Sequence, residues 1–243
     1  MDIGGFQSTT LLDYPEHLAC TVFTRGCNMR CPFCQNGSLV IKELFGSVYD
    51  EDEIIKRIEK RKNILEGVCI SGGEPTLQPD LIPFIKTIRS FDLKIKLDTN
   101  GTSPSILDRL LNEKLIDYVA MDLKSSFGAY HRLSGLKKES PLIDNVKASV
   151  LLLMKSDIPH EFRTTVINEL HDAEDIEELV CSIKGEKAYY IQPYVETGDV
   201  IGLHLKEPVH FSAPSNEKLN EMLKAARKYI PNAMIRGLDL QGS

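Results

Sequence analysis

The sequence has no apolar run long enough to cross a membrane, and its first five residues have neither the basic nor the apolar part of a secretory signal peptide. It also has no cluster of lysine and arginine interleaved with aromatic residues, and its formal net charge is -6. A general nucleic-acid-binding surface is therefore not expected. These absences predict a cytoplasmic protein with a mildly acidic surface.

Linkers and repeats are absent as well. No tract rich in proline, glycine and serine interrupts the chain, and no repeat of fixed period is visible, which argues against a solenoid. With 243 residues, of which 42% are hydrophobic, the chain can bury the core of one substantial domain. We therefore expect a single domain.

Short strand-like runs alternate with helix-like segments, which predicts an α/β fold with a parallel sheet and crossover helices. The expected strands cover residues 18–24, 67–70, 93–97, 118–123, 161–167, 188–192 and 233–235. The expected helices cover residues 49–62, 77–91, 103–113, 141–155, 172–183 and 215–229. This rhythm suits an open or closed barrel. Within the single domain, 1–243, we expect 1–17 to extend the N-terminus and 196–243 to complete the barrel.

The chain has six cysteines, which at this length and in an intracellular setting do not suggest a disulfide framework. Cys20, Cys69 and Cys181 lie in apolar strand or helix contexts, where cysteine acts as a small hydrophobic residue. We expect no chemical role for these three.

The other three cysteines, Cys27, Cys31 and Cys34, lie at C-x3-C-x2-C spacing in one short loop. Four-iron clusters and tetrahedral zinc both normally take four protein ligands, so three thiolates leave either a distant fourth ligand or an open metal position. The loop follows an expected strand, and α/β barrels build their active sites at that end of their strands. This context favours a cluster, with a zinc knuckle as the alternative.

Polar residues gather directly after three further strands, in the segments Ser71-Gly72-Gly73-Glu74-Pro75-Thr76, Asp98-Thr99-Asn100-Gly101 and Met121-Asp122-Leu123-Lys124. The paired glycines would let the backbone approach a ligand, and Glu74 would offer a carboxylate to a cationic amine. Taken alone, the glycine turn could be only a tight connection with Thr76 capping the next helix. Three such endings beside a cysteine loop favour one shared ligand site.

Together these motifs resemble the radical S-adenosylmethionine (SAM) superfamily, and within it the glycyl-radical-enzyme activases. The sequence is most similar to activating proteins of anaerobic ribonucleoside-triphosphate reductase and more distantly to pyruvate formate-lyase activating enzyme. The resemblance spans most of the chain and implies a partial (β/α)6-type TIM-like barrel. It is carried by the three cysteines with Phe33 before the last, by the three strand-end segments, and by the N-terminal residues 4–15.

The resemblance implies that Cys27, Cys31 and Cys34 bind three irons of one 4Fe-4S cluster, with SAM chelating the fourth iron. Reductive cleavage of SAM would give methionine and a 5'-deoxyadenosyl radical, which would abstract hydrogen from a glycine of a partner enzyme. The implied partner is anaerobic ribonucleoside-triphosphate reductase, and a flavodoxin- or ferredoxin-like protein would donate the electron. Neither a nucleic acid nor a membrane is an implied partner.

The resemblance also implies roles for the strand-end residues. The implied SAM contacts are Phe33 at the adenine, Gly72, Gly73 and Glu74 at the methionine amino end, and Asp98, Thr99, Asn100, Asp122 and Lys124. In the pyruvate formate-lyase branch, the positions matching Asp98, Thr99 and Met121 hold a monovalent cation beside the SAM carboxylate, and oxygen donors suit such an ion.

Several residues depart from the activase pattern. Gln35 stands where many activases have a histidine after the third cysteine. Val195 stands where the pyruvate formate-lyase branch has a second histidine. His204 and His210 are expected at the surface, and Arg163 could face a ligand or pair with a carboxylate inside the barrel. The chain has no second cysteine cluster after the first strand, so one cluster is predicted.

Two other functions fit parts of the sequence. A radical SAM enzyme acting on a small molecule would share every cofactor motif and would differ in having a closed substrate pocket. A zinc-stabilised binding module without catalysis would explain the cysteine loop but not the three strand-end segments.

Overall fold

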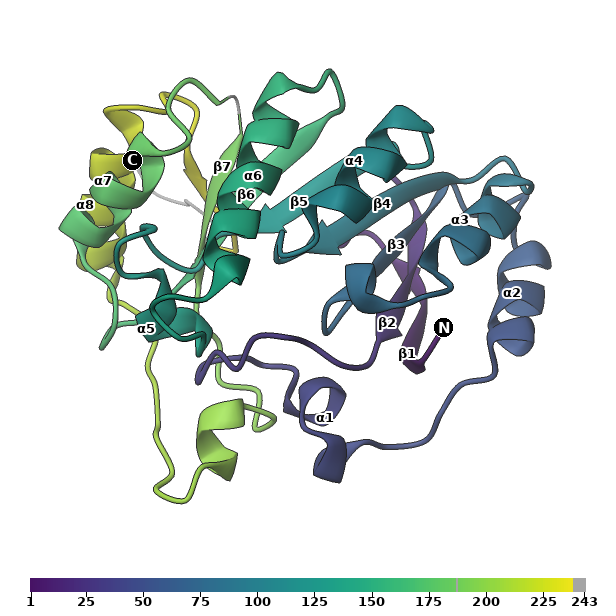
Figure 1. Cartoon of the computed structure of the whole chain (residues 1–243), viewed down its shortest axis with the longest axis horizontal. Coiled ribbons are helices and arrows are strands. Elements are labelled where there is room, and N and C mark those ends of the chain that lie inside the picture. Colours follow the sequence, from purple (N-terminus) through teal and green to yellow (C-terminus); the bar gives the residue numbers. More distant parts are fainter. Residues whose placement is uncertain (187, 238–243) are drawn as a thin grey trace.

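The computed structural model describes residues 1–186 and 188–237, in which eight strands form one sheet in chain order (Figure 1). The first pair, β1 and β2, is antiparallel, and all pairs from β2 to β8 are parallel. The strands are β1 (Ile3–Thr10), β2 (Ala19–Thr24), β3 (Gly67–Gly72), β4 (Lys94–Thr99), β5 (Tyr118–Asp122), β6 (His160–Val166), β7 (Tyr189–Pro193) and β8 (Met234–Ile235).

Helices connect the parallel strands, as the alternation predicted. The α-helices are α1 (Gly37–Val40), α2 (Glu51–Glu59), α3 (Leu81–Arg89), α4 (Pro104–Asn112), α5 (Tyr130–Ser134), α6 (Pro141–Lys155), α7 (Ala173–Cys181) and α8 (Asn216–Arg227). The described residues also form the short 3-10 helices η1 (Lys42–Leu44), η2 (Pro75–Leu77) and η3 (Ile201–His204). Helix α2 is capped by Asp50, whose carboxylate accepts a hydrogen bond from the Glu53 amide at 2.9 Å.

Among the described residues, β1 and β8 are the two edges of the sheet, so the α/β barrel is open. This confirms the partial TIM-like barrel. The N-terminal segment 1–17 contributes β1, and residues 196–237 contribute α8 and β8 to the same fold. Residues 238–243, the end of the expected barrel completion, lie outside the described residues.

Strand β1 was not expected, because its sequence IGGFQSTT contains two glycines and few β-branched apolar residues. Pairing with β2 holds it in place, beginning at Ile3 opposite Thr24, and Ile3 is fully buried. The tertiary context therefore overrides a weak local preference.

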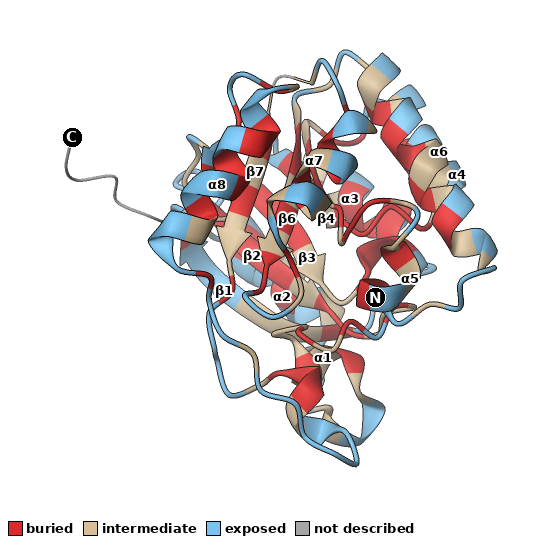
Figure 2. Cartoon of the chain, turned by 90° about the vertical axis from the view of Figure 1, so that its left-hand side faces the viewer, coloured by how far each residue is buried: buried red, intermediate tan, exposed pale blue. Residues whose placement is uncertain are grey.

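Buried residues line the strands and the helix faces that are turned toward them (Figure 2). In α3 the buried positions include Leu81, Ile85 and Ile88, which share one helix face. Cys20 and Cys69 are fully buried, as predicted. The prediction was wrong for Cys181, which is exposed because the last residue of α7 points away from that helix's buried face. In the described ranges, no helix combines the length and apolarity that spanning a membrane requires.

Candidate functional site

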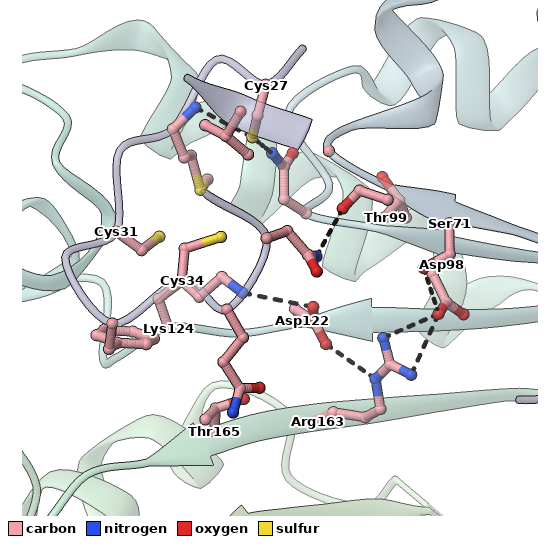
Figure 3. Close-up of a pocket in the computed structure, with 18 of the residues that line it drawn as sticks. Cys27, Cys31, Cys34, Ser71, Asp98, Thr99, Asp122, Lys124, Arg163 and Thr165 are labelled. Carbon is pink, nitrogen blue, oxygen red and sulfur yellow. Dashed lines mark hydrogen bonds and ion pairs between the residues drawn. The ribbon is translucent and has the colours of Figure 1, made fainter. Parts of the chain in front are cut away.

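A pocket of about 230 Å³ lies at the carboxyl ends of the parallel strands (Figure 3). Loops that follow successive strands supply its wall, because parallel strands end at the same edge of a sheet. Of the predicted site residues, its lining contains Cys27, Cys31, Phe33, Cys34, Gly72, Gly73, Asp98, Thr99, Asn100, Asp122 and Lys124. Glu74 and Met121 are the two predicted residues that do not line it.

The cysteine loop between β2 and α1 is fixed to the end of β4 through Asn100. The Asn100 side-chain amide donates to the Cys27 sulfur at 3.6 Å and to the Asn28 side-chain oxygen at 3.1 Å. The Cys27 sulfur also accepts a hydrogen bond from the Met29 backbone amide at 3.4 Å. Hydrogen bonds to sulfur stabilise the thiolate form that a metal ligand needs.

Burial raises the pKa of all three loop thiols, that of Cys31 to about 12, while the positive charge of Lys124 opposes the shift. Metal binding to these thiols would therefore release protons. Among the described residues, no three His, Cys, Asp or Glu side chains are set to share a single metal ion. The three thiols instead line a common pocket, an arrangement that suits a cluster in which each thiolate binds its own iron.

The two glycines after β3 allow two backbone segments to pack together. Gly72 has a φ of +109°, which favours glycine, and a Cβ atom there would lie 2.5 Å from the Thr24 backbone. A Cβ atom on Gly73 would lie 2.1 Å from the Gly26 carbonyl oxygen. Both glycines also line the pocket. The two glycines thus allow the cysteine loop to pack against the end of β3. Their expected approach to a ligand stays a prediction.

Glu74 lies behind the pocket wall and is fully buried. One carboxylate oxygen accepts hydrogen bonds from the hydroxyls of Thr76 at 2.5 Å and Thr99 at 2.8 Å, and the other accepts from the Asn100 amide at 2.6 Å. Burial raises the Glu74 pKa, and these donors oppose the shift. In this arrangement Glu74 joins the end of β3 to the end of β4, and its contact with a ligand amine stays a prediction.

A row of alternating charges crosses the floor of the pocket. Arg163 lies between two carboxylates, with its Nε 2.9 Å from Asp122 and a terminal nitrogen 3.5 Å from Asp98 (Figure 3). Lys96 also pairs with Asp98, and Lys124 lies 3.4 Å from Asp122. Burial alone would raise the pKa of both carboxyls, but the cations outweigh it and hold the Asp122 pKa at about 2 and that of Asp98 below its usual value.

The residues implied in cation binding are only partly brought together. Asp98 and Thr99 line the pocket, but the Met121 side chain packs at Gly101 instead. The Asp98 carboxylate is already paired with Lys96 and Arg163, and two positive neighbours oppose the approach of a further cation. The cation site therefore stays a prediction.

A segment from the C-terminal part of the chain, residues 195–211, crosses the cysteine loop, and we call it the crossing segment. Asp199 caps α1: its carboxylate accepts from the Ser38 amide at 2.9 Å and the Ser38 hydroxyl at 2.7 Å, and its carbonyl accepts from the Gly37 amide at 2.9 Å. In Figure 1 the crossing segment lies beside α1 below the sheet. It thereby fixes the residues that follow Cys34.

Backbone hydrogen bonds continue this contact along the loop. The Ile201 amide donates to the Cys34 carbonyl at 3.0 Å, and the Gly202 amide donates to the Pro32 carbonyl at 2.6 Å. The Gln35 side chain donates to the Val195 carbonyl. Two departures from the activase pattern, Gln35 and Val195, are thus direct partners in this structure.

Sequence reasoning assigned no role to several residues that line the pocket, among them Met29, Thr165 and Gln192. Thr165 lies two residues after Arg163 on β6, so both point to the same face of the strand. This alternation along β6 was the sequence signal that could have identified Thr165 as a pocket residue. The sequence left open whether Arg163 faces a ligand or pairs with a carboxylate. In the structure it does pair with carboxylates, and it also lines the pocket. His204 and His210 are exposed, in agreement with the surface prediction.

A sequence profile of the Radical SAM superfamily matches residues 21–183. The chain is 33% identical to a candidate glycyl-radical enzyme activating enzyme of Methanocaldococcus jannaschii, over 98% of this chain and 96% of that protein. It is 26% identical to the pyruvate formate-lyase-activating enzyme of Clostridium pasteurianum, over 81% of this chain and 83% of that enzyme.

A similar fold occurs in Streptococcus suis SuiB bound to S-adenosylmethionine, with a TM-score of 0.66 and 18% identity. The likeness covers 89% of this chain and 49% of SuiB, so the chain spans about half of that protein. At this identity the comparison supports the fold alone.

Proposed function

This chain belongs to the radical SAM superfamily, and we propose that it is a glycyl-radical-enzyme activase whose partner is anaerobic ribonucleoside-triphosphate reductase. The cofactors characteristic of the superfamily are a 4Fe-4S cluster and SAM. The observation that carries the proposal is the pocket in which the cysteine loop meets the ends of the neighbouring parallel strands.

The residues of the pocket fit these cofactors. Cys27, Cys31 and Cys34 would hold the cluster, since all three thiols line one pocket and two donors already reach the Cys27 sulfur. When bound, the cluster and SAM supply a one-electron reductive cleavage that produces the hydrogen-abstracting radical. The charged side chains of Asp122 and Lys124 would bind and orient the polar groups of SAM.

Two observations support a protein substrate over a small molecule. The M. jannaschii relative that matches this chain over nearly the whole length of both is named for activation of a glycyl-radical enzyme, which is a protein substrate. The sheet is open between β1 and β8 in the described residues, and an open barrel can admit a glycine-bearing loop from the side. A flavodoxin- or ferredoxin-like protein would donate the electron.

The test begins with anaerobically reconstituted protein, studied by electron paramagnetic resonance (EPR) with and without SAM. We expect a reduced-cluster signal that changes when SAM is added, together with formation of 5'-deoxyadenosine. Stoichiometric zinc without an iron signal would instead identify a structural metal site.

The partner is tested by adding an anaerobic ribonucleoside-triphosphate reductase to the reduced protein and SAM. We expect a glycyl-radical EPR signal on the reductase and none when the radical-bearing glycine is replaced by alanine. A cluster that cleaves SAM but never produces this signal would refute the partner and leave the superfamily chemistry intact. A small-molecule substrate would then be the next candidate.

A further inference from the structure

Tyr130, the first residue of α5, has a hydroxyl without a hydrogen-bond partner. The side chain is completely buried, and its hydroxyl makes no hydrogen bond among the described residues. Only Thr164 and Tyr189 share this property in the described part of the chain. Burial raises the Tyr130 pKa, and the nearby Lys124 backbone amide opposes this rise but offers the hydroxyl no acceptor. A buried polar group without a partner costs free energy, so each such group calls for an explanation.

The helix that carries Tyr130 packs against the cysteine loop. The Arg30 amide, immediately before Cys31, donates to the Ser134 carbonyl at 2.9 Å, and the Ser134 hydroxyl donates to the Tyr130 carbonyl at 2.7 Å. A Cβ atom on Gly135, directly after α5, would lie 2.5 Å from the Arg30 carbonyl oxygen. Any side chain larger than that of glycine at position 135 would push α5 away from the cysteine loop.

The cysteine sulfurs differ in their hydrogen bonds. The Cys27 sulfur accepts from Met29 and Asn100, and the Asn36 amide stabilises the thiolate of Cys34. The Cys31 sulfur accepts no hydrogen bond within the described ranges, and Cys31, like Tyr130, is buried. Burial is the main cause of the raised pKa of Tyr130, and the negative charge of a Cys31 thiolate lies near enough to raise it further.

We propose that Tyr130 is a positioning residue for the cluster, whose hydroxyl donates a hydrogen bond to the Cys31 sulfur when that sulfur ligates iron. The proposal rests on the ligand assignment under the proposed function. It gives the buried hydroxyl an acceptor and gives Cys31 the donor that it lacks. A hydrogen bond to a ligating sulfur stabilises the reduced, more negative cluster and so raises its reduction potential.

Tyr189 supplies a matched control. Its hydroxyl is likewise buried and makes no hydrogen bond in the described residues, with the Thr164 hydroxyl as its polar neighbour. Tyr189 begins β7, whereas the pocket lies at the other end of the strands. Gln192, three residues later on β7, lines the pocket, so the strand alternation turns Tyr189 toward the opposite face. Substituting either tyrosine by phenylalanine removes one orphaned hydroxyl and keeps the ring.

The experiment is an EPR-monitored redox titration of reconstituted wild-type, Tyr130→Phe and Tyr189→Phe proteins in the absence of SAM, with iron content and thermal unfolding measured on each. We expect Tyr130→Phe to retain its iron and to lower the equilibrium constant for reduction by about threefold to tenfold, where tenfold equals about 59 mV for one electron. Tyr189→Phe should titrate like the wild type.

Equal potentials in all three proteins, or equal shifts in both variants, would overturn the role of Tyr130 while leaving the proposed function standing. A wild-type protein that binds no cluster would refute the ligand assignment and this inference with it. Unfolding of the cluster-free proteins checks the variants: Tyr130→Phe should be at least as stable as the wild type, because without the cluster its hydroxyl has no partner.

Discussion

The carboxylate of Asp199 accepts hydrogen bonds from both the backbone amide and the hydroxyl of Ser38, a residue 161 positions earlier in the chain. Helix α1 has no side-chain cap of its own at Asn36, so its N-terminus depends on this distant partner. Gly37 fits closely at the same point, because a Cβ atom there would lie 2.7 Å from an Asp199 carboxylate oxygen. The end of the cysteine loop is therefore fixed by the crossing segment.

Asp199→Ala should loosen the residues after Cys34. Loss of a helix cap costs about 0.5–2 kcal/mol, so backbone amides 37–41 should exchange with deuterium about twofold to thirtyfold faster, and less iron should be retained. Glu207→Ala, an exposed position in the same crossing segment, is the control. Unchanged exchange at 37–41 in Asp199→Ala would show that the cap is not needed.

Gly73→Ala should destabilise the fold, since the added methyl group would meet the Gly26 carbonyl oxygen and overpacking typically costs about 1–3 kcal/mol. Gly46→Ala is the matched control, because a Cβ atom at Gly46 would have no neighbour within 4 Å among the described residues. The measurement is the free energy of unfolding in urea. If both variants were equally stable, the close packing at Gly73 would not constrain the loop.

Asp122→Asn should weaken SAM binding about tenfold and leave the iron content unchanged, because it removes a charge from the pocket but no cysteine ligand. Asp117→Asn is the control: Asp117 also pairs with an arginine, Arg89, at 2.8 Å, but lies outside the pocket lining. Isothermal titration of SAM into reconstituted protein measures the effect. Wild-type affinity in Asp122→Asn would mean that this carboxylate serves only its internal ion pairs.

Cys31→Ala should abolish formation of 5'-deoxyadenosine while leaving a folded chain, because one ligand of the cluster is lost. Cys20→Ala removes another buried thiol, on β2 and outside the pocket lining, and should retain product formation. Iron content and product yield are measured on both. A full cluster with continued SAM cleavage in Cys31→Ala would refute its assignment as a ligand.

The strand-end residues of the site were predictable because β/α alternation implies parallel strands, and parallel strands bring their carboxyl ends together. Asp98 and Asp122 therefore meet in the pocket as expected. The burial of Glu74 was not predictable, since a carboxylate in a glycine turn has the same local sequence whether it faces a ligand or hydrogen-bond donors of the protein itself. The contact of Asp199 with Ser38 likewise leaves no local signal, because it depends on how distant segments pack.

The contact between Asp199 and Ser38 also bears on how the protein is made. The ribosome adds about 5–20 residues per second, so the cysteines emerge about 10–30 seconds before the segment that will cross them. Throughout that interval the nascent chain carries three thiols on a loop whose outer contacts have not yet been synthesised. Iron and sulfide that arrived during synthesis would therefore meet the three thiols before residues 195–211 cover the loop.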